Sequence, residues 1–167
     1  KAIIRTSRLY ADMGNAEKFG ATVPDGIKET FSATMERMRR LRTRIAKYHS
    51  AERLAIAGVD LYFGAARFTG LDAIMVGGTT LRFGKALIAT GARPAPTVIP
   101  GLAEAGYFTS EEAFDLVECP RRLLVIGGGP LGCELAQACC RLGSHVVIAQ
   151  NEPKFRPKEE RDAAQLL

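Results

Sequence analysis

Apolar residues recur at helical spacing in two stretches near the start of the chain. The first stretch predicts a helix over residues 1–13, with an apolar face formed by Ile3, Ile4, Leu9 and Met13. Glycine and proline residues between positions 14 and 26 interrupt the pattern. The second stretch predicts a long amphipathic helix over residues 27–48, whose apolar positions are Ile27, Phe31, Met35, Met38, Ile45 and Tyr48.

From Gly58 onward the apolar positions alternate, which is typical of β-strands. Residues 59–63 predict a half-buried strand, because every second side chain is apolar. Residues 74–76 and 79–81 flank Gly77-Gly78, which predicts a hairpin with a two-residue turn. Residues 86–89 predict a short buried strand. These segments together predict a small antiparallel β-meander over residues 59–90.

The last third of the chain predicts a strand, a helix and a second strand. Residues 93–101 are rich in proline and are expected to connect two domains. Ser110, followed by two glutamates, resembles a helix start leading to Leu116. Residues 123–126 are a continuous apolar strand, a helix is expected to about Leu142, and residues 146–149 form another strand. This order predicts a parallel β–α–β unit.

A glycine-rich loop lies between the first strand of this unit and its helix. Gly127 permits the tight turn, Gly129 permits close approach of a pyrophosphate, and Gly132 permits close packing of helix on strand. The free N–H groups at the helix start attract phosphate. We therefore predict a dinucleotide site; the alternative is a strand–glycine–helix turn without a ligand. The site comprises Gly127, Gly128, Gly129, Pro130, Leu131, Gly132, Cys133, Glu134 and Gln150.

Gln150 stands where NAD-binding proteins of this type carry a carboxylate that holds the ribose hydroxyls. A glutamine side chain does not repel the 2′-phosphate of NADP. Lys154 and Arg156 follow and are able to meet such a phosphate, although exposed loop charges would give the same pattern. The choice between NAD and NADP stays open, with a lean towards NADP.

Composition and charge narrow the function classes. The chain has 167 residues, 47% of them hydrophobic, and no apolar run long enough to span a bilayer or to act as a secretory signal. Four cysteines and two histidines show no zinc-ligand spacing, so no metal site is predicted, and a cytoplasmic protein with reduced thiols is expected. The net charge of +5 is concentrated in helix 27–48, and we interpret its arginines as a solvated face and not as a nucleic-acid site.

The cysteines have two possible roles, a redox or metal-binding role and a packing role. Cys139 and Cys140 are adjacent, but neighbouring side chains on a helix point in different directions, which disfavours a redox or metal pair. Cys133 lies near a helix start, where a reactive thiol is one option. We favour a small residue packed behind the loop.

Several segments in this order resemble the pyridine nucleotide-disulfide oxidoreductases. They are Ile88-Ala89-Thr90-Gly91-Ala92-Arg93-Pro94, the segment around Ile99-Pro100-Gly101, and the strand with the glycine loop. The opening Lys1-Ala2-Ile3-Ile4-Arg5 is similar to the stretch that follows the family's redox-active cysteine pair. Residues 61–167 resemble the mercuric reductase-like branch, with residues 63–68 and 156–162 as markers.

The resemblance implies an α/β fold of two dinucleotide-binding, Rossmann-like domains, both incomplete here, with the small β-meander. Residues 1–100 would be part of an FAD-binding domain, and residues 101–167 the N-terminal part of an NAD(P)-binding domain. By the same resemblance, FAD would be contacted by Lys1, Ala66, Thr90, Gly91 and Ala92.

The implied activity is transfer of hydride from NAD(P)H to FAD and on to a disulfide or Hg(II)-type acceptor, by a homodimeric parent enzyme. The redox cysteine pair is expected upstream of Lys1, so no catalytic residue is assigned here, and the chain alone is expected to be inactive. Phe31, Met35 and Met38 are then expected to lack a covering partner. Two alternatives stay open: an FAD-dependent NAD(P)H reductase of the ferredoxin-reductase or NADH-dehydrogenase kind, without a redox disulfide, and a non-catalytic nucleotide-binding module.

Overall fold

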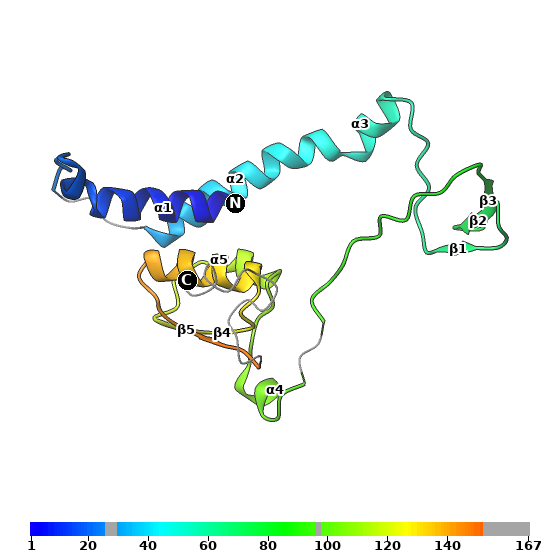
Figure 1. Cartoon of the computed structure of the whole chain (residues 1–167). Coiled ribbons are helices and arrows are strands. Elements are labelled where there is room, and N and C mark those ends of the chain that lie inside the picture. Colours follow the sequence, from blue (N-terminus) through cyan, green and yellow to red (C-terminus); the bar gives the residue numbers. More distant parts are fainter. Residues whose placement is uncertain (26–29, 96–97, 152–167) are drawn as a thin grey trace. The chain divides into compact units, whose positions relative to one another are not determined.

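The computed structural model describes residues 1–25, 30–95 and 98–151. The chain forms two compact units. The first comprises Lys1–Leu41 and Val98–Leu167, and the second comprises Arg42–Thr97. The elements follow one another along the chain as labelled in Figure 1, and each unit is described by itself.

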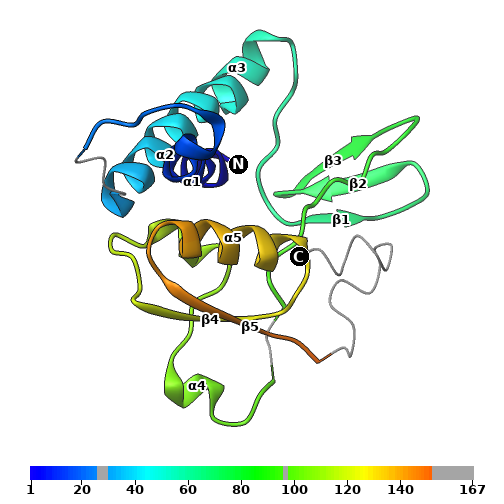
Figure 2. The same ribbon diagram turned by 60° about the vertical axis from the view of Figure 1, so that its left-hand side comes forward.

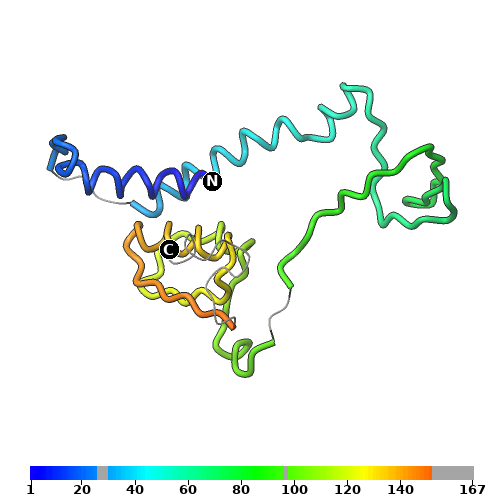
Figure 3. Tube along the Cα trace, in the orientation of Figure 1, coloured from blue at the N-terminus to red at the C-terminus, as the bar shows by residue number. Residues whose placement is uncertain are grey.

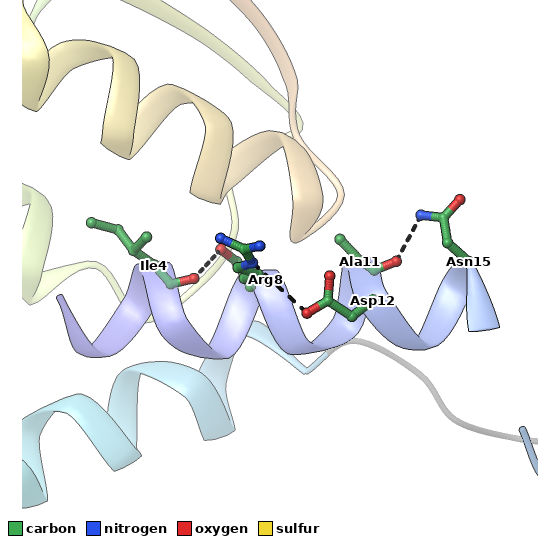
Figure 4. A network of polar contacts seen from close by, with 6 residues as sticks. Ile4, Arg8, Ala11, Asp12 and Asn15 are labelled. Carbon is green, nitrogen blue, oxygen red and sulfur yellow. Dashed lines mark hydrogen bonds and ion pairs between the residues drawn. The ribbon is translucent and has the colours of Figure 1, made fainter. Parts of the chain in front are cut away.

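Helix α1 spans Ala2–Gly14, which confirms the first predicted helix. Its polar contacts are local: Arg8 forms an ion pair with Asp12 one turn on, with nitrogen and oxygen 3.8 Å apart. The Asn15 side-chain amide donates a 2.8 Å hydrogen bond to the Ala11 carbonyl, which satisfies an acceptor at the helix end (Figure 4). A 3₁₀ turn, Ala16–Phe19, follows and ends at Gly20, whose φ of +75° favours glycine.

The long basic segment is divided into three pieces. Helix α2 spans Phe31–Ala46, a 3₁₀ turn covers Lys47–His49, and helix α3 spans Ala51–Ile56. The break lies at Ser50, whose hydroxyl accepts a hydrogen bond from the Arg53 amide and so caps α3. The predicted helix is therefore confirmed over α2, while its expected start at residues 27–29 lies outside the described residues.

The core of the first unit joins α1, α2 and helix α5, which spans Pro130–Arg141. Its buried members are Ile3, Phe31, Met35, Met38, Ala138 and Leu142. The expectation that the face of α2 lacks cover is wrong, because Phe31, Met35 and Met38 are buried in one cluster with residues from α1 and α5, helices that can be followed in Figure 2. Burial of each of the larger members, which are Ile3, Phe31, Met35, Met38 and Leu142, stabilises the unit by roughly 1.5–3 kcal/mol.

The apolar faces predicted for the first two helices include side chains that the structure leaves exposed. Leu9 on α1 is 50% exposed, so the buried face of that helix passes through Ile3 and Ser7 instead. Ile45 is 56% exposed and Tyr48 is 60% exposed. These side chains belong to the predicted stripe but lie outside the core cluster, so the prediction of burial is wrong for them.

The predicted β–α–β unit is confirmed. Strand β4, Arg122–Ile126, pairs in parallel with strand β5, His145–Ala149, in a register from Arg122 opposite His145 to Ile126 opposite Ala149. Helix α5 packs on this pair. One set of side chains is half-buried and the alternate set is exposed, including Leu124 and Val147. The apolar run predicted as a strand at residues 123–126 is therefore covered on only one face by the described residues.

In the second unit the predicted hairpin is confirmed. Strand β2, Ala73–Val76, pairs antiparallel with strand β3, Thr79–Arg82, around Gly77 and Gly78. These glycines have φ values of +55° and +84°, as a tight hairpin turn requires. Strand β1, Ala66–Phe68, pairs with the other edge of β2.

The outer strands of the predicted meander are wrong. Residues 59–63 are not a strand; β1 begins three residues later and takes the free edge of β2. Residues 86–89 are not a strand either, and the chain from 83 to 95 has no helix or strand (Figure 3). Leu87 is 91% exposed and Ile88 is 71% exposed. An apolar run is not sufficient for a strand when no neighbouring strand accepts its hydrogen bonds.

Short elements precede β4 in the chain. The described part of the predicted connector, residues 93–95 and 98–101, has no strand or regular helix, and helix α4, Leu102–Ala105, follows it. The helix expected from Ser110 is a single 3₁₀ turn, Glu112–Asp115. The Thr109 amide donates to the Glu112 carboxylate at 2.7 Å, and this hydrogen bond lowers the pKa of that carboxyl. The described part of the chain includes no helix that is both long and apolar enough to cross a membrane.

Candidate dinucleotide-binding site

The glycine loop is fixed to the neighbouring strand. The Gly127 amide donates a 2.7 Å hydrogen bond to the Ala149 carbonyl at the end of β5. The φ of Gly127 is +111°, which L side chains rarely adopt, so the turn out of β4 favours glycine. The beginning of the loop and the end of β5 are therefore held together.

Gly132 allows the helix to lie against this turn. A Cβ built on Gly132 would overlap the Gly127 carbonyl oxygen and would lie 3.4 Å from the Val125 Cγ1. Because the obstacle is backbone, no rotation of a side chain relieves it. The predicted role of Gly132, close packing of helix on strand, has a direct physical cause here.

Gly129 has a different environment. Its φ is −72° and its ψ is 173°, a conformation that any residue adopts. No atom of the described chain lies within 4 Å of a Cβ built at this position, apart from its neighbours in the sequence. The fold therefore does not require glycine here. A ligand whose phosphates approach the backbone would require it, which fits a dinucleotide.

The start of α5 has the polarity that phosphates need. The first intrahelical bond runs from the Cys133 amide to the Gly129 carbonyl at 3.0 Å, so the amides of Leu131 and Gly132 precede the helical bonding pattern. Among the described residues no side chain caps this end, and Pro130 occupies the first helical position. Uncapped amides and the helix dipole attract an anion.

Three further predicted residues lie around the loop. Cys133 is half-buried, and its thiol donates a 3.3 Å hydrogen bond to the Gly128 carbonyl. Glu134 is exposed on α5, and Gln150 directly follows β5. The structure thus brings together the whole predicted NAD(P) set, while Lys154 and Arg156 lie outside the described residues.

The predicted FAD residues are divided between the units. Lys1 is exposed before α1 in the first unit. Ala66 lies in β1, and Thr90, Gly91 and Ala92 lie in the exposed irregular segment, all in the second unit. Their roles toward FAD stay predictions.

Of the remaining cysteines, Cys119 and Cys139 are half-buried and Cys140 is exposed. Burial, followed by the proximity of Cys119 and Cys140, raises the pKa of Cys139 to about 11. The Cys119 thiol donates to the Leu142 carbonyl at 3.3 Å. Within the described ranges, no three His, Cys, Asp or Glu side chains are grouped so as to hold a metal ion.

Arginines of α2 also make contacts within the first unit. The Arg37 guanidinium donates to the Thr6 hydroxyl at 3.2 Å, and that of Arg39 donates to the Leu116 carbonyl at 2.9 Å. Arg40 pairs with Glu36 one turn earlier. Arg37 and Arg39 therefore bond to other parts of the first unit, and the interpretation of the basic residues as a solvated face stays a prediction.

The parallel β–α–β unit with its glycine loop places the chain in the class of α/β proteins built to bind a dinucleotide. Residues 6–167 match the sequence profile of the pyridine nucleotide-disulphide oxidoreductases, and the chain belongs to this family. Members are FAD-dependent enzymes that use NAD(P)H. The resemblance inferred from the sequence is thereby confirmed.

Individual relatives agree with this assignment. The chain is 31% identical to dihydrolipoyl dehydrogenase of Chlorobaculum tepidum over 172 residues, covering 100% of this chain and 36% of that protein. It is 42% identical to mercuric reductase of Staphylococcus aureus over 98 residues, 59% of this chain and 18% of that protein. The chain thus spans about a third or less of these curated relatives.

A solved structure has a similar fold. The HOCl-induced flavoprotein disulfide reductase RclA of Escherichia coli matches with a TM-score of 0.72 and 25% identity, over 99% of this chain and 34% of that one. The likeness supports a mixed α/β fold of flavoprotein disulfide reductase type. Two Rossmann-like domains stay a prediction.

Sequence reasoning assigned Cys133 to the site but missed its hydrogen bond to the loop. A cysteine at this position of the motif carries no spacing signal of its own, since many side chains occupy it without changing the glycine pattern. The contact follows from the geometry of the first helical turn.

Proposed function

We propose that the intact protein containing this chain is a flavoprotein disulfide reductase that passes hydride from NAD(P)H to FAD and then to a disulfide or Hg(II)-type acceptor. One observation carries the proposal: Gly129 has open space and an ordinary conformation beside an uncapped helix start. The family membership supplies the pair of cofactors.

In this proposal the described residues bind and orient the dinucleotide. The amides at the start of α5 would hold its phosphates, and Gly127 and Gly132 keep the helix close to β4. Gln150 would face the adenosine ribose at the end of β5. The nicotinamide and flavin rings supply the hydride chemistry when bound, and the protein supplies position.

The domain assignment belongs to the same proposal. Residues 1–100 would contribute to an FAD domain, with Lys1, Ala66 and residues 90–92 contacting FAD, and residues 101–167 would contribute to an NAD(P) domain. The parent would be a homodimer acting on a small molecule or disulfide, and the relatives named dihydrolipoyl dehydrogenase and mercuric reductase suggest the two acceptor classes. A flavin reductase without a redox disulfide is the second candidate.

The test uses Gly129→Val in the full-length protein. The isopropyl group would occupy the space that the phosphates need, so NAD(P)H should no longer reduce the flavin in stopped-flow absorbance measurements. FAD content should stay normal, because the loop belongs to the other domain.

Gly84→Val is the matched control, since Gly84 also has open space and no left-handed φ. Flavin reduction in the Gly129→Val protein at the rate of the unaltered protein would show that this loop does not bind NAD(P)H.

A further inference from the structure

We propose that Cys133 is a positioning residue for the NAD(P)H phosphates, because its thiol sets the orientation of the peptide between Gly128 and Gly129. The inference rests on the proposed function of the loop. The glycine motif itself requires only that the side chain at position 133 has room. The proposal adds that this side chain makes a specific hydrogen bond to the loop.

One residue holds two consecutive carbonyls of the loop. The Cys133 amide donates to the Gly129 carbonyl at 3.0 Å, as the first bond of α5. The Cys133 thiol donates to the Gly128 carbonyl at 3.3 Å. Because Gly128 is buried and Cys133 is half-buried, water competes little for this contact.

The thiol contact determines where an amide points. Among the described residues there is no cis peptide bond, and in a trans peptide the carbonyl and the following N–H point in opposite directions. A Gly128 carbonyl directed at the Cys133 thiol therefore directs the Gly129 N–H away from Cys133. The Gly127 amide is already bonded to the Ala149 carbonyl.

The Gly129 N–H thus joins the uncapped amides of α5 as a donor for phosphate. Three successive glycines have wide backbone freedom, and ordering them when a ligand binds costs free energy. A hydrogen bond that orients the peptide in advance reduces this cost. Loss of the thiol should consequently weaken dinucleotide binding more than it weakens the fold.

The experiment compares Cys133→Val and Cys133→Ser in the full-length protein, with binding of NADP⁺ and NAD⁺ measured by calorimetry. Valine is close to cysteine in size but lacks a donor, whereas serine keeps one. Loss of one such hydrogen bond should weaken binding about fivefold in Cys133→Val. Cys133→Ser should recover affinity to within about twofold, since it restores an O–H donor.

Further measurements separate positioning from simple packing. In steady-state assays Cys133→Val should raise the KM for NAD(P)H and leave kcat unchanged, because the thiol holds the loop and not the reacting ring. FAD content and the melting temperature should stay close to those of the unaltered protein. Cys140→Val, on an exposed part of the same helix, is the control and should bind NADP⁺ normally.

Unaltered affinity in Cys133→Val, or equal weakening in Cys133→Val and Cys133→Ser, would overturn the positioning role. This result is distinguishable from failure of the proposed function. If Gly129→Val loses NADP⁺ binding while Cys133→Val binds normally, only the role of Cys133 is contradicted. If Gly129→Val binds NADP⁺ normally, the assignment of the loop as the dinucleotide site is contradicted.

Discussion

At the scale of single residues, two glycines three positions apart serve different purposes. Gly132 is required by the fold, because a Cβ there meets the Gly127 backbone. Gly129 is free of such obstacles and lies where a ligand would approach. Substitution of Gly132 is therefore expected to lower stability, whereas substitution of Gly129 is expected to weaken ligand binding.

The first prediction concerns Gly132→Ala in the full-length protein. The added methyl group must displace backbone, and such overpacking costs about 1–3 kcal/mol. Urea unfolding followed by circular dichroism should show this decrease in the free energy of unfolding. Gly129→Ala is the control, and its stability should change by less than about 0.5 kcal/mol. Equal stability of the two variants would contradict the geometry.

The second prediction concerns Gln150 and the choice of nicotinamide. Its amide carries no charge that would repel a 2′-phosphate, so the full-length enzyme should accept NADPH at least as well as NADH. Gln150→Glu should shift the preference toward NADH by roughly 1–3 kcal/mol, measured as the ratio of kcat/KM values. Gln150→Asn, which adds no charge, is the control. A strong preference of the unaltered enzyme for NADH would show this interpretation of Gln150 to be wrong.

At the scale of elements, the sequence correctly predicted the helices and strands whose formation depends on local patterns. The β4–α5–β5 unit, the hairpin and α1 have strong periodicity or obligatory glycines, and they were predicted correctly. The strands expected at 59–63 and 86–89 were wrong, because their partners depend on residues distant in sequence. The thiol contact of Cys133 also lies beyond sequence patterns, since it depends on the orientation of one peptide.

The third prediction tests how α2 is buried. Met35 is 1% exposed between α1 and α5, so Met35→Ala should lower the free energy of unfolding by about 2–5 kcal/mol. Ile45 belonged to the same predicted face but is exposed, and Ile45→Ala serves as the control, with an effect below about 0.5 kcal/mol. Chemical denaturation of both full-length variants gives the comparison. An equal decrease in the free energy of unfolding of both variants would support the longer buried face that the sequence predicted.

At the scale of the whole molecule, the first unit is assembled from the two ends of the described sequence. Helices α1 and α2 pack with α5, although more than 80 residues separate Leu41 from α5. The chain covers 36% of the Chlorobaculum tepidum relative, so the proposed electron acceptor has to be tested on the intact protein.

The fourth prediction distinguishes the two flavoprotein proposals at this scale. An intact disulfide reductase should take up about two electron pairs per FAD in an anaerobic dithionite titration, one for the flavin and one for the disulfide. A reductase without a redox disulfide should take up one. Cys119→Ser is the control. Cys119 is in no disulfide and its thiol is hydrogen-bonded to the Leu142 carbonyl, so the substitution should leave the electron uptake unchanged.

The bond between the Gly127 amide and the Ala149 carbonyl has a mechanical consequence. It joins the loop that would hold the pyrophosphate to the strand end that carries Gln150, so the two recognition points keep a constant separation. In the proposed site, this hydrogen bond would help to fix the distance between the pyrophosphate contacts and the ribose contacts. Engineering of NADP or NAD selectivity at position 150 should therefore succeed only with changes that leave this spacing intact, since a shift of β5 would displace the phosphate contacts together with the ribose contacts.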